Sequence, residues 1–298
     1  MVDKIISDNA NDADVILAKI PYDKTSSFGK GADKGPDAII NCLDAQIELY
    51  ERFTKWDPSK HLKIASMHLN VEDMKPESMA KEVSSKIKSM IEKDKFVVSL
   101  GGEHSISAGI FDAWSKAKLD DKITILQIDA HLDLRDDDSD YNPKSSKYAH
   151  SCVMKRALDM GFKIVPVGIR AYADFELETA KNNDIAVFEW PRTEDKQLIK
   201  NILKEIKTDN VYLTLDADGI DPGHMPATGT PVQGGLSWKF TFELLKEVFE
   251  KKNVIGADIV EVAPRNDGSL TEYGAAQICY YMIALKFKDK FKKNKNKL

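Results

Sequence analysis

The chain contains seven short apolar segments rich in β-branched residues, and this pattern constrains its fold more than any other feature. Most of these segments are nearly continuous in apolar residues and do not alternate apolar with polar positions. Parallel strands that are covered on both faces have this character. The sequence therefore predicts a buried, mostly parallel sheet. The predicted strands are Val15–Ile20, Phe96–Leu100, Ile123–Ile128, Ile164–Ile169, Ile185–Phe188, Val211–Leu215 and Val254–Val260.

Segments with helical periodicity lie between several of these strands. In Glu77–Lys93 the apolar side chains recur at the spacing of one helix face. Lys196–Ile206 and Thr241–Lys251 have the same pattern, and Glu272–Phe287 is expected to be a closing helix. The alternation of strands and helices predicts a single doubly wound α/β domain that spans residues 1–298.

Composition limits the classes of function. The 43 basic and 48 acidic residues give a formal charge of −5, so no basic surface for nucleic acid is expected. The three cysteines, Cys42, Cys152 and Cys279, are widely spaced, which argues against a disulfide framework or a cysteine zinc site. The N-terminal segment lacks the apolar core of a signal peptide, and no apolar run approaches the roughly 20 residues that span a bilayer. We therefore expect a soluble, cytoplasmic protein without a membrane partner.

Two polar segments are expected to lie outside the regular elements. Asp133–Tyr148 is predicted to be a loop, either covering a site or simply solvated, and it carries the acidic run Asp136–Asp140. The lysine-rich tail, residues 286–298, is expected to be a frayed, solubilising end rather than an arm that binds nucleic acid.

Acidic residues and histidines follow directly after four of the predicted strands. In open parallel sheets, ligands bind beyond the carboxyl ends of the strands, and these ends lie at one edge. Three strands deliver histidine and aspartate to this edge, and a fourth delivers Glu261. The three segments are Gly101–Ser105 with His104, Asp129–Asp133 with His131, and Asp216–Pro222 with Asp218.

The spacing of these residues favours a site for two metal ions. In an extended chain, residues two apart point the same way, so Asp129, His131 and Asp133 share one side. Asp216 and Asp218 do likewise, and His104 completes a set of two imidazoles and four carboxylates. One divalent ion cannot use six such ligands and keep an open position, whereas two ions can. Oxygen-rich ligands with a minority of imidazole favour manganese, and two ions can activate a shared water.

Simpler interpretations exist for each motif taken alone. An isolated Asp-x-His pair seldom binds metal, and Asp-x-Asp before a glycine often only ends a strand or caps a helix. Three such segments at three strand ends make these interpretations weak. His61, His68 and His224 have no comparable setting and are expected at the surface or in loops. Cys152 is expected to be a buried small side chain rather than a nucleophile.

In combination, these motifs resemble the arginase–agmatinase (ureohydrolase) family along nearly the whole chain. Thr25–Phe28 and Gly35–Ile39 resemble an N-terminal loop of the family, and Gly101–Ser105 resembles its first metal motif, although many members have Asp where Glu103 stands. Further similar segments are Asp129–Asp133, Asp216–Pro222, Ala227–Pro231, Gly234–Leu236 and Asp258–Pro264.

The resemblance implies a fold, a cofactor and roles for single residues. The fold is a three-layer α/β/α sandwich around a mostly parallel sheet, commonly assembled into trimers or hexamers. The cofactor is a pair of Mn²⁺ ions, which activate a water that attacks the guanidinium carbon. Asp133 would shuttle the proton of this water, Glu261 would pair with the guanidinium, and His150 would assist proton transfer. The implied ligands are His104, Asp129, His131, Asp133, Asp216 and Asp218, with Asp133 and Asp216 among the bridging ones.

The residues after Asp133 bear on the substrate. Arginases usually have Asn and Ser beyond this position, whereas this chain has Leu134 and Arg135, which resembles agmatinases, especially prokaryotic ones. The acidic run Asp136–Asp140 would favour a dication such as agmatine. We therefore expect hydrolysis of agmatine to putrescine and urea, with aminopropylagmatine, arginine, guanidinobutyrate and formimidoylglutamate as alternatives. Alternatives from another class are a catalytically silent metal-binding scaffold and a zinc deacetylase-like enzyme.

Overall fold

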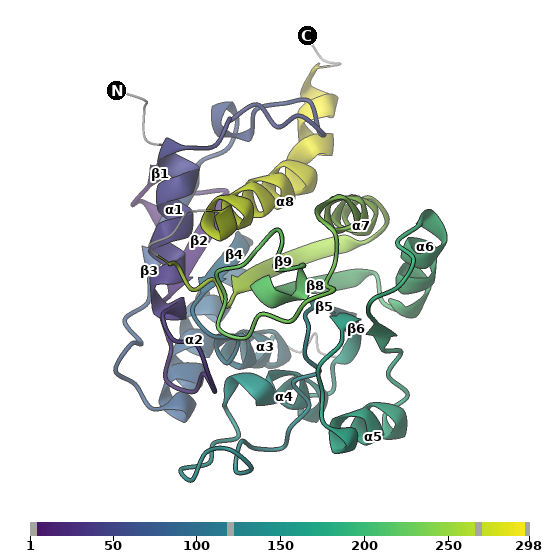
Figure 1. Ribbon diagram of the computed structural model, residues 1–298. Helices are drawn as coiled ribbons and strands as arrows, with labels where there is room; N and C mark the ends of the chain where they lie inside the picture. Colours follow the sequence, from purple (N-terminus) through teal and green to yellow (C-terminus); the bar gives the residue numbers. More distant parts are fainter. Residues whose placement is uncertain (1–4, 118–121, 266–269, 296–298) are drawn as a thin grey trace.

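The computed structural model describes residues 5–117, 122–265 and 270–295, and these form a three-layer α/β/α sandwich (Figure 1). Its sheet has the strand order β1-β3-β2-β4-β9-β8-β5-β6-β7, and every neighbouring pair is parallel. The predicted fold class is therefore confirmed. The strands are β1 Ile6–Ser7, β2 Val15–Ile20, β3 Ile64–His68, β4 Phe96–Gly101, β5 Ile123–Ile128, β6 Lys163–Ile169, β7 Phe188–Glu189, β8 Asn210–Asp216 and β9 Asn253–Val260.

Helices cover both faces of the sheet, and each face has its own apolar core. One core joins α1, α6, α7 and α8 to the sheet, and the other joins α2, α3, α4 and α5 to its opposite face. Successive strand residues alternate between the two cores, so each strand is apolar throughout. The helices are α1 Gly35–Ala45, α2 Pro76–Ile91, α3 Ile106–Lys116, α4 Val153–Asp159, α5 Asp174–Asn182, α6 Lys196–Glu205, α7 Trp238–Lys251 and α8 Leu270–Lys295.

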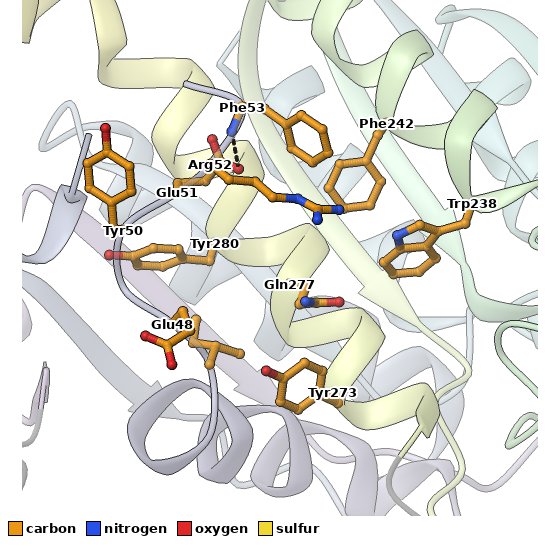
Figure 2. Close-up of a pocket in the computed structure, with 11 residues that line it drawn as sticks. Glu48, Tyr50, Glu51, Arg52, Phe53, Trp238, Phe242, Tyr273, Gln277 and Tyr280 are labelled. Atoms are coloured by element: carbon orange, nitrogen blue, oxygen red, sulfur yellow. Dashed lines mark hydrogen bonds between the residues drawn. The ribbon is translucent and has the colours of Figure 1, made fainter. Parts of the chain in front are cut away.

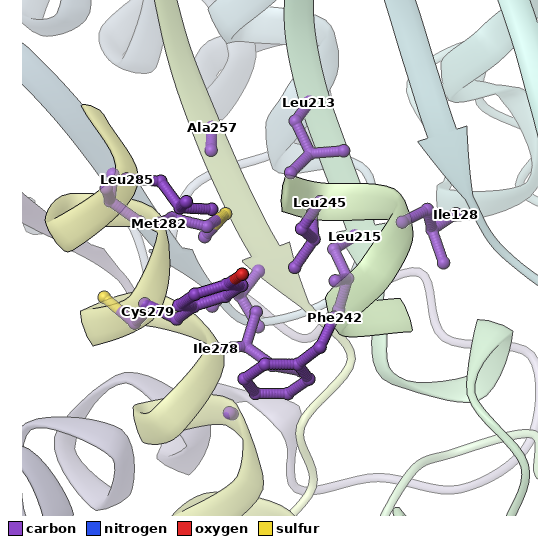
Figure 3. Packing of buried hydrophobic residues seen from close by; sticks show 14 of the residues in the cluster. Ile128, Leu213, Leu215, Phe242, Leu245, Ala257, Ile278, Cys279, Met282 and Leu285 are labelled. Carbon is purple, nitrogen blue, oxygen red and sulfur yellow. The ribbon is translucent and has the colours of Figure 1, made fainter. Parts of the chain in front are cut away.

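In the first core, α7 and α8 lie on the middle of the sheet. Figure 3 shows Phe242 of α7 and Met282 of α8 packed over Leu215 of β8 and Ala257 of β9. These side chains are buried, so truncating one of the large ones costs on the order of 3 kcal/mol. The rigid layer that results fixes the strand ends that carry the site.

Several elements differ from the sequence expectation. The short strands β1 and β3 and the helices α1, α3, α4 and α5 were not predicted. Gly35–Ile39, expected within a loop, begins α1, and the strand expected at Ile185–Phe188 is reduced to Phe188–Glu189. The closing helix is longer than expected, since α8 continues through the lysine-rich segment to Lys295 instead of fraying. The last tail residues, 296–298, lie outside the described residues.

The four strands whose ends carry the predicted site residues are consecutive in the sheet. Their order is β4, β9, β8, β5, at the centre of the sheet. Because all four are parallel, their carboxyl ends meet at one edge. Within the described part of the chain, no helix combines the length and apolar character that crossing a membrane requires.

Candidate metal centre

The structure brings every predicted site residue to one edge of the sheet. His104 lies three residues beyond β4, and Glu261 directly follows β9. Asp216 ends β8, and Asp218 lies in the short 3-10 helix that follows it. The remaining predicted ligands, Asp129, His131 and Asp133, follow β5.

The first part of the centre surrounds the His104 ring. Its Nδ1 atom lies 3.1 Å from Asp129 Oδ2, 3.1 Å from Asp133 Oδ2 and 3.4 Å from Asp216 Oδ2. His104 is fully buried, and its Nδ1 is a buried nitrogen without a hydrogen-bond partner of good geometry. A ring nitrogen that faces three carboxylate oxygens at ligand-like spacing suits a cation placed between them.

The second part of the centre surrounds the His131 ring. Its Nδ1 atom lies 3.2 Å from Asp218 Oδ2 and 3.6 Å from Asp129 Oδ1. Two sets of three ligand atoms each lie within 4.8 Å of one another: His104, Asp129 and Asp216, and then Asp129, His131 and Asp218. Asp129 belongs to both sets and uses a different oxygen in each. Asp129 is thus the residue that the two sets share. Asp133, which the resemblance implied as a bridging ligand, belongs to neither set, and its Oδ2 atom lies 3.1 Å from His104 Nδ1.

Electrostatics at this edge require positive charge. Burial and the neighbouring carboxylates Asp218 and Asp129 raise the pKa of Asp216 well above its usual range. Burial and then Asp129 raise the pKa of Asp133 to about 6. Burial opposes a charged ring, but the nearby carboxylates of Asp129, Asp133 and Asp216 outweigh it and raise the pKa of His104. Four clustered carboxylates are costly without cations, and two divalent ions would neutralise them.

Polar residues inside the strands orient the His104 ring. His104 Nε2 donates to Thr214 Oγ1 at 2.8 Å, and Thr214 Oγ1 donates to Asp258 Oδ1 at 2.6 Å. Asp258 also accepts from Ser107 Oγ and Tyr212 OH. Such a chain fixes the tautomer that leaves Nδ1 free to bind metal. Sequence reasoning gave Thr214 and Asp258 no role, although polar residues inside otherwise apolar strands were a visible signal.

Glu261 and His150 lie beside the carboxylate cluster. Glu261 Oε1 accepts from the backbone N–H of His104 at 2.8 Å and lies 3.6 Å from His150 Nδ1. Burial opposes protonation of His150, but Glu261 outweighs it and raises the pKa of the ring. Asp133 and Glu261 both have positive φ, 51° and 61°, which is strained for residues other than glycine. Their neighbours therefore hold these two carboxylates in fixed directions.

A cavity of about 500 Å³ opens over this cluster. Its walls contain the predicted site residues other than His104 and Asp129. They also include Arg135, Tyr141, Tyr172, Glu176 and Thr230, none of which was predicted as a site residue. Glu176 is nearly buried and accepts backbone N–H groups from Leu134 and Ala173. It is therefore the carboxylate fixed in the wall of the cavity away from the ligand cluster.

The acidic run Asp136–Asp140 does not form the mouth of this cavity, contrary to the sequence expectation. Asp136 pairs with Arg156 and Lys147, and Asp140 pairs with Arg135. Asp138 is fully buried and accepts hydrogen bonds from its own loop. None of these carboxylates lines the cavity. The loop that follows Asp133 does reach the site, through Arg135 and Tyr141.

A second cavity, of about 370 Å³, lies on another part of the molecule (Figure 2). Aromatic side chains from α7, α8 and residues 50–53 line it, including Phe53, Trp238 and Tyr280. The Arg52 guanidinium lies 4.6 Å from the centre of the Phe53 ring. No predicted ligand or catalytic residue borders this cavity, so it does not belong to the candidate metal centre.

The residues expected to be structural behave as predicted. Cys152 is buried, and burial raises the pKa of its thiol to about 12, so it is no nucleophile. His61, His68 and His224 are exposed and lie away from the cluster.

Comparison with known proteins assigns the chain to a family. The profile of the Arginase family matches residues 13–284. An N(1)-aminopropylagmatine ureohydrolase of Synechocystis sp. is 35% identical over 91% of this chain and 89% of its own length. An agmatinase of Pyrococcus horikoshii is 31% identical over 92% of both chains. Among solved structures, the agmatine ureohydrolase of Thermoplasma volcanium is similar with a TM-score of 0.85, at 28% identity over 98% of this chain and 97% of that one.

Proposed function

The chain belongs to the arginase family of ureohydrolases, and we propose that it hydrolyses an aminoalkylguanidine to urea and an amine, with agmatine as the first candidate substrate and putrescine as its product. The observation that carries this proposal is the position of Glu261. One oxygen of its carboxylate is anchored on the His104 N–H, and its side chain borders the cavity. No hydrogen bond from another described residue is found at Oε2, which is available to a ligand. A guanidinium presents a planar fork of donors that suits such a carboxylate.

The ligand set fits a pair of divalent ions, for which we propose Mn²⁺. His104, Asp133 and Asp216 would hold one ion, His131 and Asp218 the other, and Asp129 would contact both. When bound, such a pair supplies a water of lowered pKa as nucleophile. Four carboxylates with two imidazoles and no thiolate suit manganese better than a closed zinc site.

The protein's own residues would then orient the substrate and move protons. Glu261 would hold the guanidinium, and Asp133 would take up the proton that the attacking water loses. His150, whose Nδ1 lies 3.6 Å from Glu261 Oε1, would take up a proton and pass one from Nδ1 to the amine that leaves, so that the ring is neutral before and after the step. Both acid–base groups border the same cavity.

The far end of the cavity supports a substrate with a distal ammonium. Glu176 is fixed in its wall, and the Arg135 guanidinium is shared between Asp140 and Glu176, whose Oε2 lies 4.0 Å from Arg135 Nη2. A distal ammonium would meet the Glu176 carboxylate, whereas the carboxylate of arginine would be repelled by it. We therefore propose discrimination against arginine.

N(1)-aminopropylagmatine is the second candidate. The relatives with 34–35% identity carry this name, whereas agmatinases among the relatives are 30–32% identical. Its additional amine would extend from the cavity toward solvent.

A urea assay tests the proposal. We expect kcat/KM for agmatine and aminopropylagmatine to exceed that for arginine by about 100-fold or more, with guanidinobutyrate and formimidoylglutamate also poor (formamide release is followed for the latter). Release of urea from any of these compounds would rule out a catalytically silent scaffold and a zinc deacetylase-like enzyme. A clear preference for arginine would contradict the assignment of the far end.

We also propose that the protein works in the cytoplasm as a homo-oligomer, a trimer or hexamer, without nucleic acid or membrane partners. Light scattering of the purified protein measures its mass. A monomer of 33.4 kDa at micromolar concentration would contradict this part of the proposal.

A further inference from the structure

Residues 23–31, which connect β2 to the segment before α1, pass next to His150. We call them the 23–31 loop. Thr25 is the buried contact point of this loop. Its hydroxyl oxygen accepts a hydrogen bond from the backbone N–H of His150 at 3.0 Å and donates to Glu103 Oε1. One hydroxyl group thus links the backbone at His150 to a buried carboxylate.

The buried carboxylate of Glu103 holds the 23–31 loop through hydrogen bonds. Its Oε2 atom accepts from the backbone N–H groups of Thr25 and Ser26, both at 2.7 Å, and from Ser26 Oγ at 3.0 Å. Its Oε1 atom also accepts from Ser105 Oγ at 2.6 Å. Glu103 is fully buried and belongs to neither set of candidate metal ligands. A buried carboxylate is costly unless its oxygens are satisfied, and here the 23–31 loop satisfies most of them.

The same loop determines which nitrogen of His150 carries a proton. The backbone N–H of Ser27 points at His150 Nε2, 3.2 Å away. A backbone N–H can only donate, so Nε2 must accept and the neutral ring must carry its proton on Nδ1. Nδ1 is the atom that faces Glu261, and therefore the place where the guanidinium would lie.

We propose that Thr25 and Glu103 are positioning residues that hold His150 with its proton on Nδ1, facing the substrate. The expected effect on turnover rests on the proposed function, whereas the position of the proton on His150 does not. The two residues act through His150 and do not touch the substrate, since neither lines the cavity. The other end of the loop is also fixed, because the Gly29 N–H donates to the Gly229 carbonyl at 3.3 Å. Without the Thr25 hydroxyl, the loop loses its hydrogen bond to the His150 backbone and is held to this residue only weakly, through the exposed Ser27 contact.

The first test compares two substitutions at Thr25. Thr25→Val keeps the volume but removes the hydroxyl, whereas Thr25→Ser keeps the hydroxyl. We expect Thr25→Val to lower kcat about tenfold or more and to change KM less than about threefold, since proton transfer is affected more than binding. Thr25→Ser should stay within about threefold of the wild type. Both variants should bind as much metal as the wild type and should unfold in a single transition above the assay temperature, which excludes loss of the site or the fold.

The second test asks whether Thr25 acts through His150. In a His150→Asn background, Thr25→Val should slow turnover less than about twofold, because the group it positions is already absent. If Thr25→Val slows the His150→Asn enzyme as much as the wild type, its role is structural and the proposal is wrong. Glu103→Gln, which replaces one acceptor oxygen with a donor, should behave as Thr25→Val does in both backgrounds.

A spectroscopic measurement separates this inference from the proposed function. Nitrogen NMR of the histidine side chains reports which ring nitrogen is protonated, independently of turnover. We expect the Nδ1–H tautomer of neutral His150 in the wild type and a mixture in Thr25→Val. If no guanidino compound releases urea but the tautomer still depends on Thr25, the proposed function fails and the positioning stands. A wild-type Nε2–H tautomer, or one unchanged in Thr25→Val, would overturn the positioning itself.

Discussion

Glu261 Oε1 accepts a hydrogen bond from the backbone N–H of His104 at 2.8 Å. The residue proposed to bind the guanidinium is thus anchored on a residue proposed to bind metal. This contact joins the ends of β9 and β4, which are neighbours in the sheet. The pairing of β4 with β9 therefore sets the distance between the Glu261 carboxylate, which is proposed to bind the substrate, and the proposed pair of metal ions.

Glu261→Gln should separate substrate binding from metal binding. The amide oxygen can still accept from the His104 N–H, but the charge that pairs with the guanidinium is lost. We expect kcat/KM to fall about 100-fold or more, with the metal content unchanged. Wild-type turnover by a fully metal-loaded variant would refute the assignment of Glu261.

Thr214→Val should weaken metal binding without touching a ligand. The His104 Nε2–H then loses its acceptor, so the ring orientation is no longer fixed. Loss of such a partner typically lowers metal affinity by about 10–100-fold. Thr124→Val is a matched control, because Thr124 is a buried strand threonine whose hydroxyl pairs with Thr208 outside the site. Equal metal affinities of the two variants would show that the Thr214 contact is unimportant.

The metal-free protein should lose stability as the pH rises. The folded-state pKa values of His104, Asp133 and Asp216 are raised, so the folded protein holds protons that the unfolded chain releases. Their stabilisation is present at low pH and is lost as the pH rises through each folded-state pKa. Asp129 has a lowered pKa, but its contribution changes with pH only in the acid range, where the unfolded carboxyl group titrates, so it does not alter the trend above about pH 6. We expect a lower unfolding temperature at about pH 9 than at about pH 6, on either side of the unfolded histidine pKa.

Mn²⁺ should cancel this pH dependence. The ions bind the deprotonated ligands, so added metal should raise the unfolding temperature more at the higher pH. Calorimetry of chelator-treated protein, with and without MnCl₂, measures both effects. A metal-free protein that becomes more stable between these pH values would contradict the described charge cluster.

Glu176→Gln should affect substrates according to their distal charge. We expect kcat/KM for agmatine to fall about tenfold, because an ion pair in the cavity is lost, and that for butylguanidine to change little. Asp136→Asn is the control, since this exposed carboxylate pairs with Arg156 and Lys147 instead of lining the cavity. If Glu176→Gln lowered kcat/KM equally for agmatine and butylguanidine, the distal ammonium of agmatine would not bind at Glu176.

The sequence predicted the centre of the sheet and the edge where the candidate ligands gather, for a physical reason. Strands buried on both faces are continuously apolar, so the acidic residues that end β5 and β8 stand out. The outer strand β3 was missed because Ser66 and His68 break its apolar pattern. Helix α3 was missed because it begins with small and polar residues such as Ser107 and Gly109.

Contacts between distant segments could not be predicted from local patterns. Thr25 and His150 are 125 residues apart, and no periodicity connects them. The sequence expectation placed the acidic mouth at Asp136–Asp140, but Arg156 and Lys147 neutralise Asp136 only once the chain is folded. Tertiary packing decides which further carboxylate lines the cavity besides the predicted site residues, and among the described residues this is Glu176.

The most direct test of the central claim is a metal titration of chelator-treated protein followed by urea release from agmatine or aminopropylagmatine. We expect activity to require a second equivalent of Mn²⁺ per chain and to reach its maximum near two bound ions, as determined by elemental analysis. Asp218→Asn, which alters the His131 side of the centre, should bind the second ion poorly and lose most activity. Full urea release with a single bound ion, or no urea from any guanidino compound at two bound ions, would contradict the account.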